Sequence, residues 1–62
     1  MMTRKDYVAT AEILNDFYQE MSIGLEEKFD NMVNDFCAMF AEDNDRFLAV
    51  KFVDACYKVE VN

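Results

Sequence analysis

The chain has 62 residues, of which 53% are hydrophobic and 15% aromatic, and thirteen Asp and Glu against six Lys and Arg give it a formal charge of −7. A chain this short forms one small domain, residues 1–62, which buries only about 60% of its unfolded surface. The apolar content excludes a disordered acidic tail. The negative charge repels phosphate and therefore disfavours direct binding to nucleic acid.

The first predicted helix spans residues 4–21. Thr3, followed three residues later by Asp6, is typical of a capping box and indicates a helix start at about Arg4. Apolar residues then recur at helical spacing, so that one side of the helix is apolar as far as residue 21. This side consists of Tyr7, Thr10, Ala11, Leu14, Phe17, Tyr18 and Met21.

The second predicted helix, residues 25–41, has an unusually aromatic apolar side. Leu25, Met32 and Met39 lie on one line at seven-residue spacing, and we expect this line to be the centre of the buried side. Bulky residues flank the line on both sides, namely Phe29, Val33, Phe36 and Phe40. The first helix supplies the matching apolar side.

The connection between these helices contains the only glycine, Gly24. Gly24 can adopt the left-handed conformation that ends a helix, which predicts an antiparallel hairpin. The alternative is one long helix bent at Gly24, because both apolar sides keep the same seven-residue phase. Such a helix needs a dimer to cover its apolar side. We favour the hairpin.

The third predicted helix is short and spans residues 45–57. The polar run at residues 42–45 predicts that the second helix ends near residue 41, with Asn44 or Asp45 as the next cap. One apolar side carries Leu48, Ala49, Phe52 and Cys56. Phe47 points off that side and is expected to pack near Phe40, and the tail, residues 58–62, is expected to be frayed or extended. The predicted fold is all-α, an antiparallel helical hairpin plus a short third helix.

The residue types exclude most catalytic chemistry. Without histidine there is no Ser-His or Cys-His pair and no histidine metal ligand, and one glycine cannot build a phosphate-binding loop. Asp43, Asp45 and Asp54 match three positions of a calcium loop, but Phe47 and Leu48 occupy positions that require a ligand and a glycine. We therefore predict no enzyme activity, no metal and no cofactor.

The two cysteines, Cys37 and Cys56, lie on the apolar sides of their helices. This placement favours reduced core residues in a reducing compartment, with a disulfide as the alternative. The longest apolar run, residues 36–41, is far below the ~20 residues of a membrane span. No signal peptide is visible either. We expect a cytoplasmic protein that does not enter a membrane.

Aromatic and methionine side chains are more numerous than two short helices need to cover each other. Such residues are enriched in interface cores, so they form either a single-chain core or a surface for a protein partner or a second copy, a homodimer. The interface candidates are Phe17, Met21, Phe29, Met32, Phe36 and Met39. The sequence thus predicts a protein-interaction module.

An acidic surface supports an alternative function. Glu12, Asp16 and Glu20 repeat at four-residue spacing, about 6 Å apart on a helix, close to the spacing of phosphates along one strand. With Glu27 and Asp30 they are candidates for an inhibitor that imitates nucleic acid and blocks a host defence or transcription protein. A solubilising surface is the simpler interpretation.

Both ends of the chain carry a resemblance. The opening residues 2–7 (MTRKDY) and the closing pattern Phe40, Asp43-Asn44, Arg46-Phe47, Phe52, Ala55-Cys56 resemble small uncharacterised proteins of bacteriophages and prophages. Those proteins often have a proline where this chain has Asp45. The resemblance implies a phage-encoded protein in the cytoplasm of an infected host, and it implies no known activity.

Overall fold

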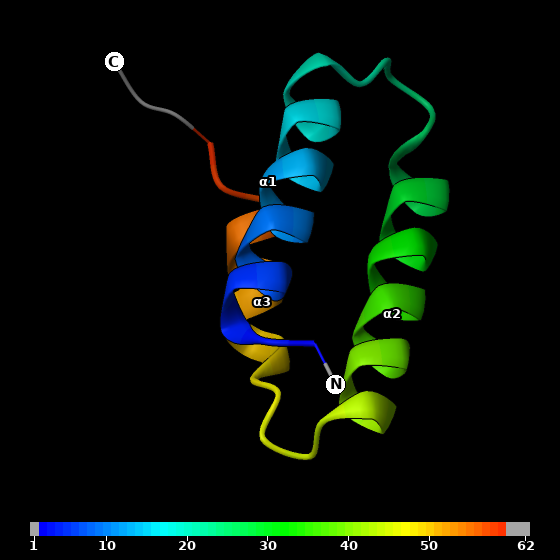
Figure 1. Ribbon diagram of the computed structural model, residues 1–62. Coiled ribbons are helices and arrows are strands. Elements are labelled where there is room, and N and C mark those ends of the chain that lie inside the picture. Colours follow the sequence, from blue (N-terminus) through cyan, green and yellow to red (C-terminus); the bar gives the residue numbers. More distant parts are fainter. Residues whose placement is uncertain (1, 60–62) are drawn as a thin grey trace.

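The structure is a computed structural model and describes residues 2–59. Its described part consists of three helices, α1 (Arg4–Glu20), α2 (Glu26–Asp43) and α3 (Ala49–Cys56), and contains no strand. In Figure 1, α1 and α2 run antiparallel and α3 lies behind α1, against which it packs most closely. The predicted all-α hairpin with a short third helix is confirmed, and the continuous bent helix is wrong.

The start of α1 is held by the predicted capping box. The Asp6 carboxylate accepts hydrogen bonds from the backbone N–H of Thr3 at 2.9 Å and from the Thr3 hydroxyl at 3.2 Å. The backbone N–H of Met2 donates to the carboxylate of Asp43 at 2.8 Å, near the end of α2. Residues 2 and 3 are therefore bonded both to the first turn of α1 and to the last residue of α2, at the end of the hairpin opposite the turn.

The turn between α1 and α2 depends on Gly24, whose φ is +104°. Its N–H donates to the Glu26 carboxylate at 2.8 Å, and the N–H of Leu25 donates to the Ser22 carbonyl at 3.4 Å. The positive φ expected for Gly24 is present, but in the middle of the turn, since α1 ends earlier, at Glu20. Residues with a Cβ rarely adopt this conformation, which explains a glycine here.

The connection between α2 and α3 differs from the prediction. α2 continues to Asp43, and α3 begins at Ala49 instead of Asp45. The side-chain carbonyl of Asn44 accepts a hydrogen bond from the N–H of Arg46 at 3.0 Å, and its backbone carbonyl accepts one from Phe47 at 3.0 Å. This local turn is an alternative to helix for residues 44–47, so the cap expected at Asn44 or Asp45 does not form.

Phe47 is the second reason for the late start of α3. Its ring packs 5.4 Å from Phe40 and 5.6 Å from Phe52, measured between ring centroids, so the predicted contact with Phe40 is confirmed. Residues before α3 are therefore placed by core packing. Leu48 and Ala49, both expected on the buried side of the third helix, are exposed, Leu48 by 60%, so the prediction is wrong for these two residues. Of the predicted tail, residues 60–62 lie outside the described residues.

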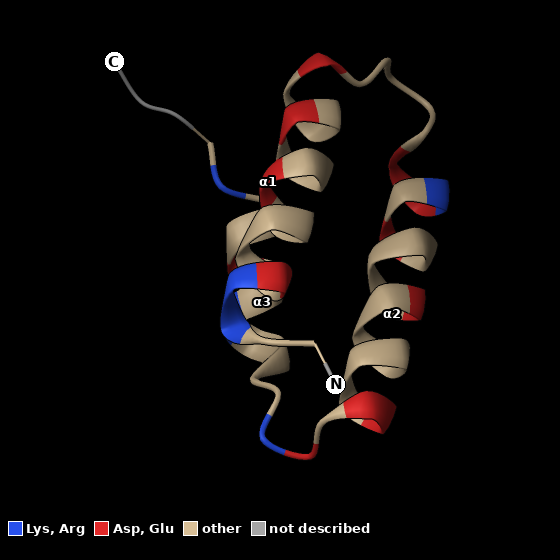
Figure 2. Cartoon of the chain, in the orientation of Figure 1, with Lys and Arg blue, Asp and Glu red and all other residues tan. Residues whose placement is uncertain are grey.

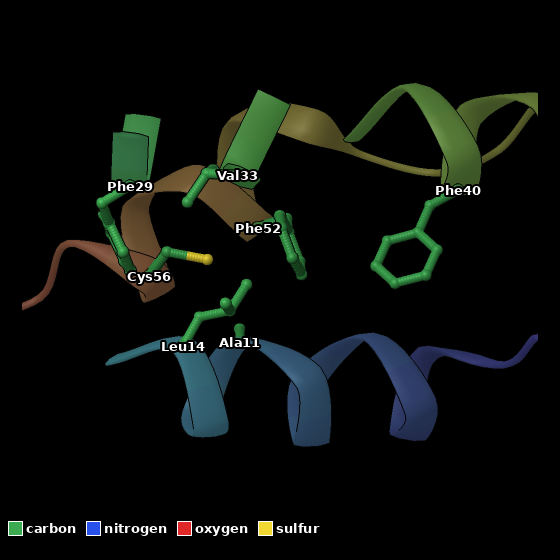
Figure 3. Close-up of a cluster of buried hydrophobic side chains, with 7 residues drawn as sticks. All are labelled: Ala11, Leu14, Phe29, Val33, Phe40, Phe52 and Cys56. Carbon is green, nitrogen blue, oxygen red and sulfur yellow. The ribbon is translucent and has the colours of Figure 1, made fainter. Parts of the chain in front are cut away.

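Seven buried side chains from all three helices form the core (Figure 3). They are Ala11, Leu14, Phe29, Val33, Phe40, Phe52 and Cys56. The buried side of α2 is thus centred on the phenylalanines and Val33, not on the line of Leu25, Met32 and Met39. Leu25 is 36% exposed and Met39 is 49% exposed, so the line that was expected at the centre of the buried side lies at the edge of that side.

Candidate interaction surface

Within the described residues, the hairpin of α1 and α2 is covered by a further helix, α3, on one side only. In Figure 1, α3 lies behind α1, and no other helix covers the side of the hairpin that faces the viewer. The two long helices are held apart by large aromatic side chains: the ring of Phe29 on α2 lies 5.9 Å from that of Phe17 and 5.4 Å from that of Tyr18, both on α1. The hairpin therefore has a covered and an uncovered side.

A shallow apolar groove lies near the turn of the hairpin. It has a volume of about 230 Å³ and is lined by Phe17, Leu25, Lys28, Phe29 and Met32. Phe17 is 49% exposed, and its ring stacks on the ring of the buried Phe29 with an interplanar angle of 11°. The groove thus has a buried core residue, Phe29, among its lining residues, whereas Phe17 and Leu25 are accessible to a partner.

Met39 extends this apolar surface along α2. It lies seven residues beyond Met32, two turns along the same side of the helix. Phe36 lies between them and is half-buried against the core. We call Phe17, Leu25, Met32 and Met39 the front surface. Exposed apolar groups at helical spacing are typical of helix-binding surfaces.

The predicted interface candidates therefore divide into three groups. Phe17 and Met39 are exposed, and Met21, Met32 and Phe36 are half-buried. Phe29 is instead a core residue, only 2% exposed, and cannot contact a partner in this fold. Leu25 also lines the groove but was not among the interface candidates. Its seven-residue spacing from Met32, the same as that between Met32 and Met39, is the sequence signal that could have identified it.

The acidic candidates are all exposed, but they do not all lie together. Glu12, Asp16 and Glu20 follow one another on α1 at four-residue spacing, where Figure 2 shows acidic residues on the upper turns of that helix. Asp30, by contrast, accepts a hydrogen bond from the Tyr57 hydroxyl, just after α3. Burial, followed by this hydrogen bond and the charge of Asp30, raises the pKa of Tyr57 well above its usual range. Asp30 is therefore part of the contact between α2 and the end of α3.

Neither cysteine is disulfide-bonded. Cys56 is fully buried, and burial, with a smaller contribution from Cys37, raises the pKa of its thiol to about 11. Burial also raises the pKa of Cys37. Both thiols are protonated at neutral pH, and the thiol is a poor nucleophile compared with the thiolate. In residues 2–59, no group of three or more His, Cys, Asp or Glu is placed to hold a metal ion.

Comparison with protein-family models, with curated proteins and with solved structures finds no match to this chain. Within the part of the chain that the structure describes, no helix combines the length and apolar character needed to cross a membrane. Inferences about function therefore rest on the surface itself.

Proposed function

We propose that the chain is a small, acidic, non-enzymatic interaction module that binds a protein partner through the front surface. One observation carries the proposal: Phe17, Leu25 and Met39 are exposed, and Phe17 and Leu25, with half-buried Met32, line an open apolar groove. The resemblance at both ends of the chain supports a phage-encoded protein acting in the cytoplasm of a bacterial host.

An amphipathic helix is the partner that this geometry favours. The groove runs between two antiparallel helices, and a helix placed along it would present residues at positions i, i+3, i+4 and i+7 to Phe17 and Met32. Methionine suits such a role because its flexible, polarisable side chain adapts to different apolar shapes. Apolar burial dominates the contact, so binding is expected to survive high salt.

The test compares capture of partners from host extract by the parent protein and by a Met32→Lys/Met39→Lys variant. The variant is expected to lose the captured protein, whereas capture by the parent persists in about 0.5 M salt, where the Debye length is a few Å. Val50→Lys is the matched control, since Val50 is 74% exposed on α3. Equal capture by the parent and the double variant, with unchanged helix content, would overturn the proposal.

A nucleic-acid-mimicking inhibitor is the second candidate, favoured by the exposed acidic row on α1. Glu12, Asp16 and Glu20 present carboxylates at intervals of about 6 Å along the helix. Binding through this row would be lost in the variant Glu12→Lys/Asp16→Lys and in about 0.5 M salt. The double methionine variant would still bind. The two candidates therefore give opposite patterns with the same set of proteins.

A further inference from the structure

A second hollow, on another part of the molecule, has a character unlike that of the front surface. It has a volume of about 350 Å³ and lies between the first half of α1, the α2–α3 connection and α3. Apolar side chains, including Ala11, Phe47 and Phe52, form much of its lining. The hollow is open to solvent on one side. It is large enough for one branched apolar side chain together with part of its backbone.

The rim of this hollow is basic. Arg4 from α1, Arg46 from the connection and Lys51 from α3 all line it. These are three of the six cations in a chain that carries thirteen acidic residues. Figure 2 shows the blue segments at the start of α1 and in the α2–α3 connection at this end of the molecule. An occupant of the hollow should therefore combine an apolar side chain with neighbouring carboxylates.

The opposite end of the same chain has this combination. Ile23, in the turn between α1 and α2, is 97% exposed, the highest exposure among the large apolar residues of the described part. Glu20 ends α1 just before it, and Glu26 and Glu27 begin α2 just after it. The Glu26 carboxylate accepts a hydrogen bond from the N–H of Gly24. Glu20 and Glu27 are therefore the two carboxylates near Ile23 in the sequence that are offered to a partner.

The turn cannot reach the hollow of its own chain. In Figure 1 the turn lies at the opposite end of the hairpin from the start of α1 and the α2–α3 connection, which line the hollow, and the longest dimension of the molecule is 33 Å. We propose that the turn of one copy docks into the basic hollow of a second copy, with Ile23 against the apolar lining and Glu20 and Glu27 beside the rim cations. This contact uses neither Met32 nor Met39, so it does not depend on the proposed function.

The contact joins two different surfaces and is therefore heterologous unless two copies exchange turns reciprocally. A reciprocal exchange stops at a dimer, whereas a one-way contact continues either to a closed ring or to longer chains. Both arrangements depend on local charges across the interface, because surface charges more than about 8 Å apart are screened at physiological ionic strength. Association is expected to be salt-sensitive, unlike binding at the front surface.

The experiment uses the full chain and two blocked variants. Ile23→Asp blocks the turn, and Arg46→Glu/Lys51→Glu blocks the hollow; both changes lie at exposed positions. The average mass of the parent protein, measured by sedimentation, should rise above the monomer mass of 7.3 kDa over about a hundredfold increase in concentration. The rise should be lost in about 0.5 M salt. Each blocked variant alone should remain a monomer.

A mixture of the two blocked variants is the decisive sample. The hollow-blocked chain retains an intact turn and the turn-blocked chain an intact hollow, so the mixture should associate in pairs although neither variant does so alone. Lys5→Glu/Lys58→Glu changes the net charge by the same amount outside the hollow and should behave as the parent. Met32→Lys/Met39→Lys should also self-associate normally, which separates this contact from the proposed function.

Three results would each overturn the proposal: a parent protein that remains a monomer at millimolar concentration in low salt, a blocked variant that associates as the parent does, or a mixture of blocked variants that shows no pairing. Circular dichroism of each variant checks that the helices are retained.

Discussion

Phe40 is the residue whose truncation tests the packing of this fold most sharply. Its side chain is 1% exposed and meets aromatic rings from the rest of the chain. The centroid distances are 4.8 Å to Tyr7 on α1, 5.4 Å to Phe47 in the α2–α3 connection and 5.4 Å to Phe52 on α3. Phe40 therefore connects every element at the end of the hairpin opposite the turn.

The expected cost follows from burial and size. Truncation of a buried phenylalanine to alanine costs about 3–5 kcal/mol. A 62-residue domain at about 0.05–0.15 kcal/mol per residue has only about 3–9 kcal/mol of total stability. Phe40→Ala should thus remove most of it. Phe40→Leu retains much of the buried volume but loses the aromatic pairs, and it should cost about 1–2 kcal/mol.

Urea titration followed by far-ultraviolet circular dichroism measures these differences. Ile23→Ala is the control, because an exposed apolar residue outside the core should change the free energy of unfolding by no more than about 0.5 kcal/mol. A loss below about 1 kcal/mol for Phe40→Ala, or an equal loss in the control, would refute the packing described here.

Four further predictions concern five other residues, and each is measured by the same urea titration. Gly24→Ala should destabilise the fold by about 1 kcal/mol; the space around Gly24 is open, so the cost comes from its positive φ alone. Asn15→Ala should cost about 1–2 kcal/mol, because the Asn15 amide donates to two backbone carbonyls near the end of α3, at 3.0 and 2.7 Å. Tyr7→Phe and Tyr57→Phe remove the same atom but should have opposite effects. The Tyr7 hydroxyl is buried without a hydrogen-bond partner in the described structure, so its removal should stabilise the fold by up to about 1 kcal/mol, whereas Tyr57→Phe loses a hydrogen bond to a carboxylate and should destabilise it. Finally, the Cys56 thiol ionises near its ordinary pKa of 9.0 in the unfolded chain but near 11 in the folded protein. Stability present at neutral pH should therefore fall between pH 9 and pH 11, by up to about 2–3 kcal/mol, and Cys56→Ala should flatten this fall.

Local patterns predicted much of the fold. The capping box placed the start of α1 at the correct residue, and the predicted ends of the two long helices, 4–21 and 25–41, differ from the observed ones by at most two residues. Gly24 and the polar run after residue 41 supplied the turn signals. These features depend on neighbouring residues, so they are readable without knowledge of the tertiary structure.

Features that depend on tertiary packing were not predictable in this way. The apolar residues of α2 form a wide arc, and the position of α3 decides which part of the arc is buried. Packing of α3 behind α1 places Phe29, Val33 and Phe40 at the centre and leaves Met39 at an edge. For the same reason Phe29, which the sequence suggested as an interface residue, is a core residue. The late start of α3 has a similar cause, since Phe47 packs as a core residue from a non-helical segment.

The position and length of the third helix decide which apolar side chains of the hairpin are buried and which stay exposed. A hairpin has two sides, and one packed helix can cover only one of them; α3, moreover, has eight residues and is about 12 Å long, against about 27 Å for the 18 residues of α2. The rings of Phe17 and Phe29 stack between α1 and α2, and an open groove at Phe17 and Met32 lies beside them. In Figure 1, no helix of the described residues lies over the side of the hairpin away from α3. Closing that side within one chain would require another helix. A partner that supplies apolar residues there would gain burial without any rearrangement of the core, because the residue beneath the groove, Phe29, is already fixed by its contacts with α1 and with Tyr57 beyond α3.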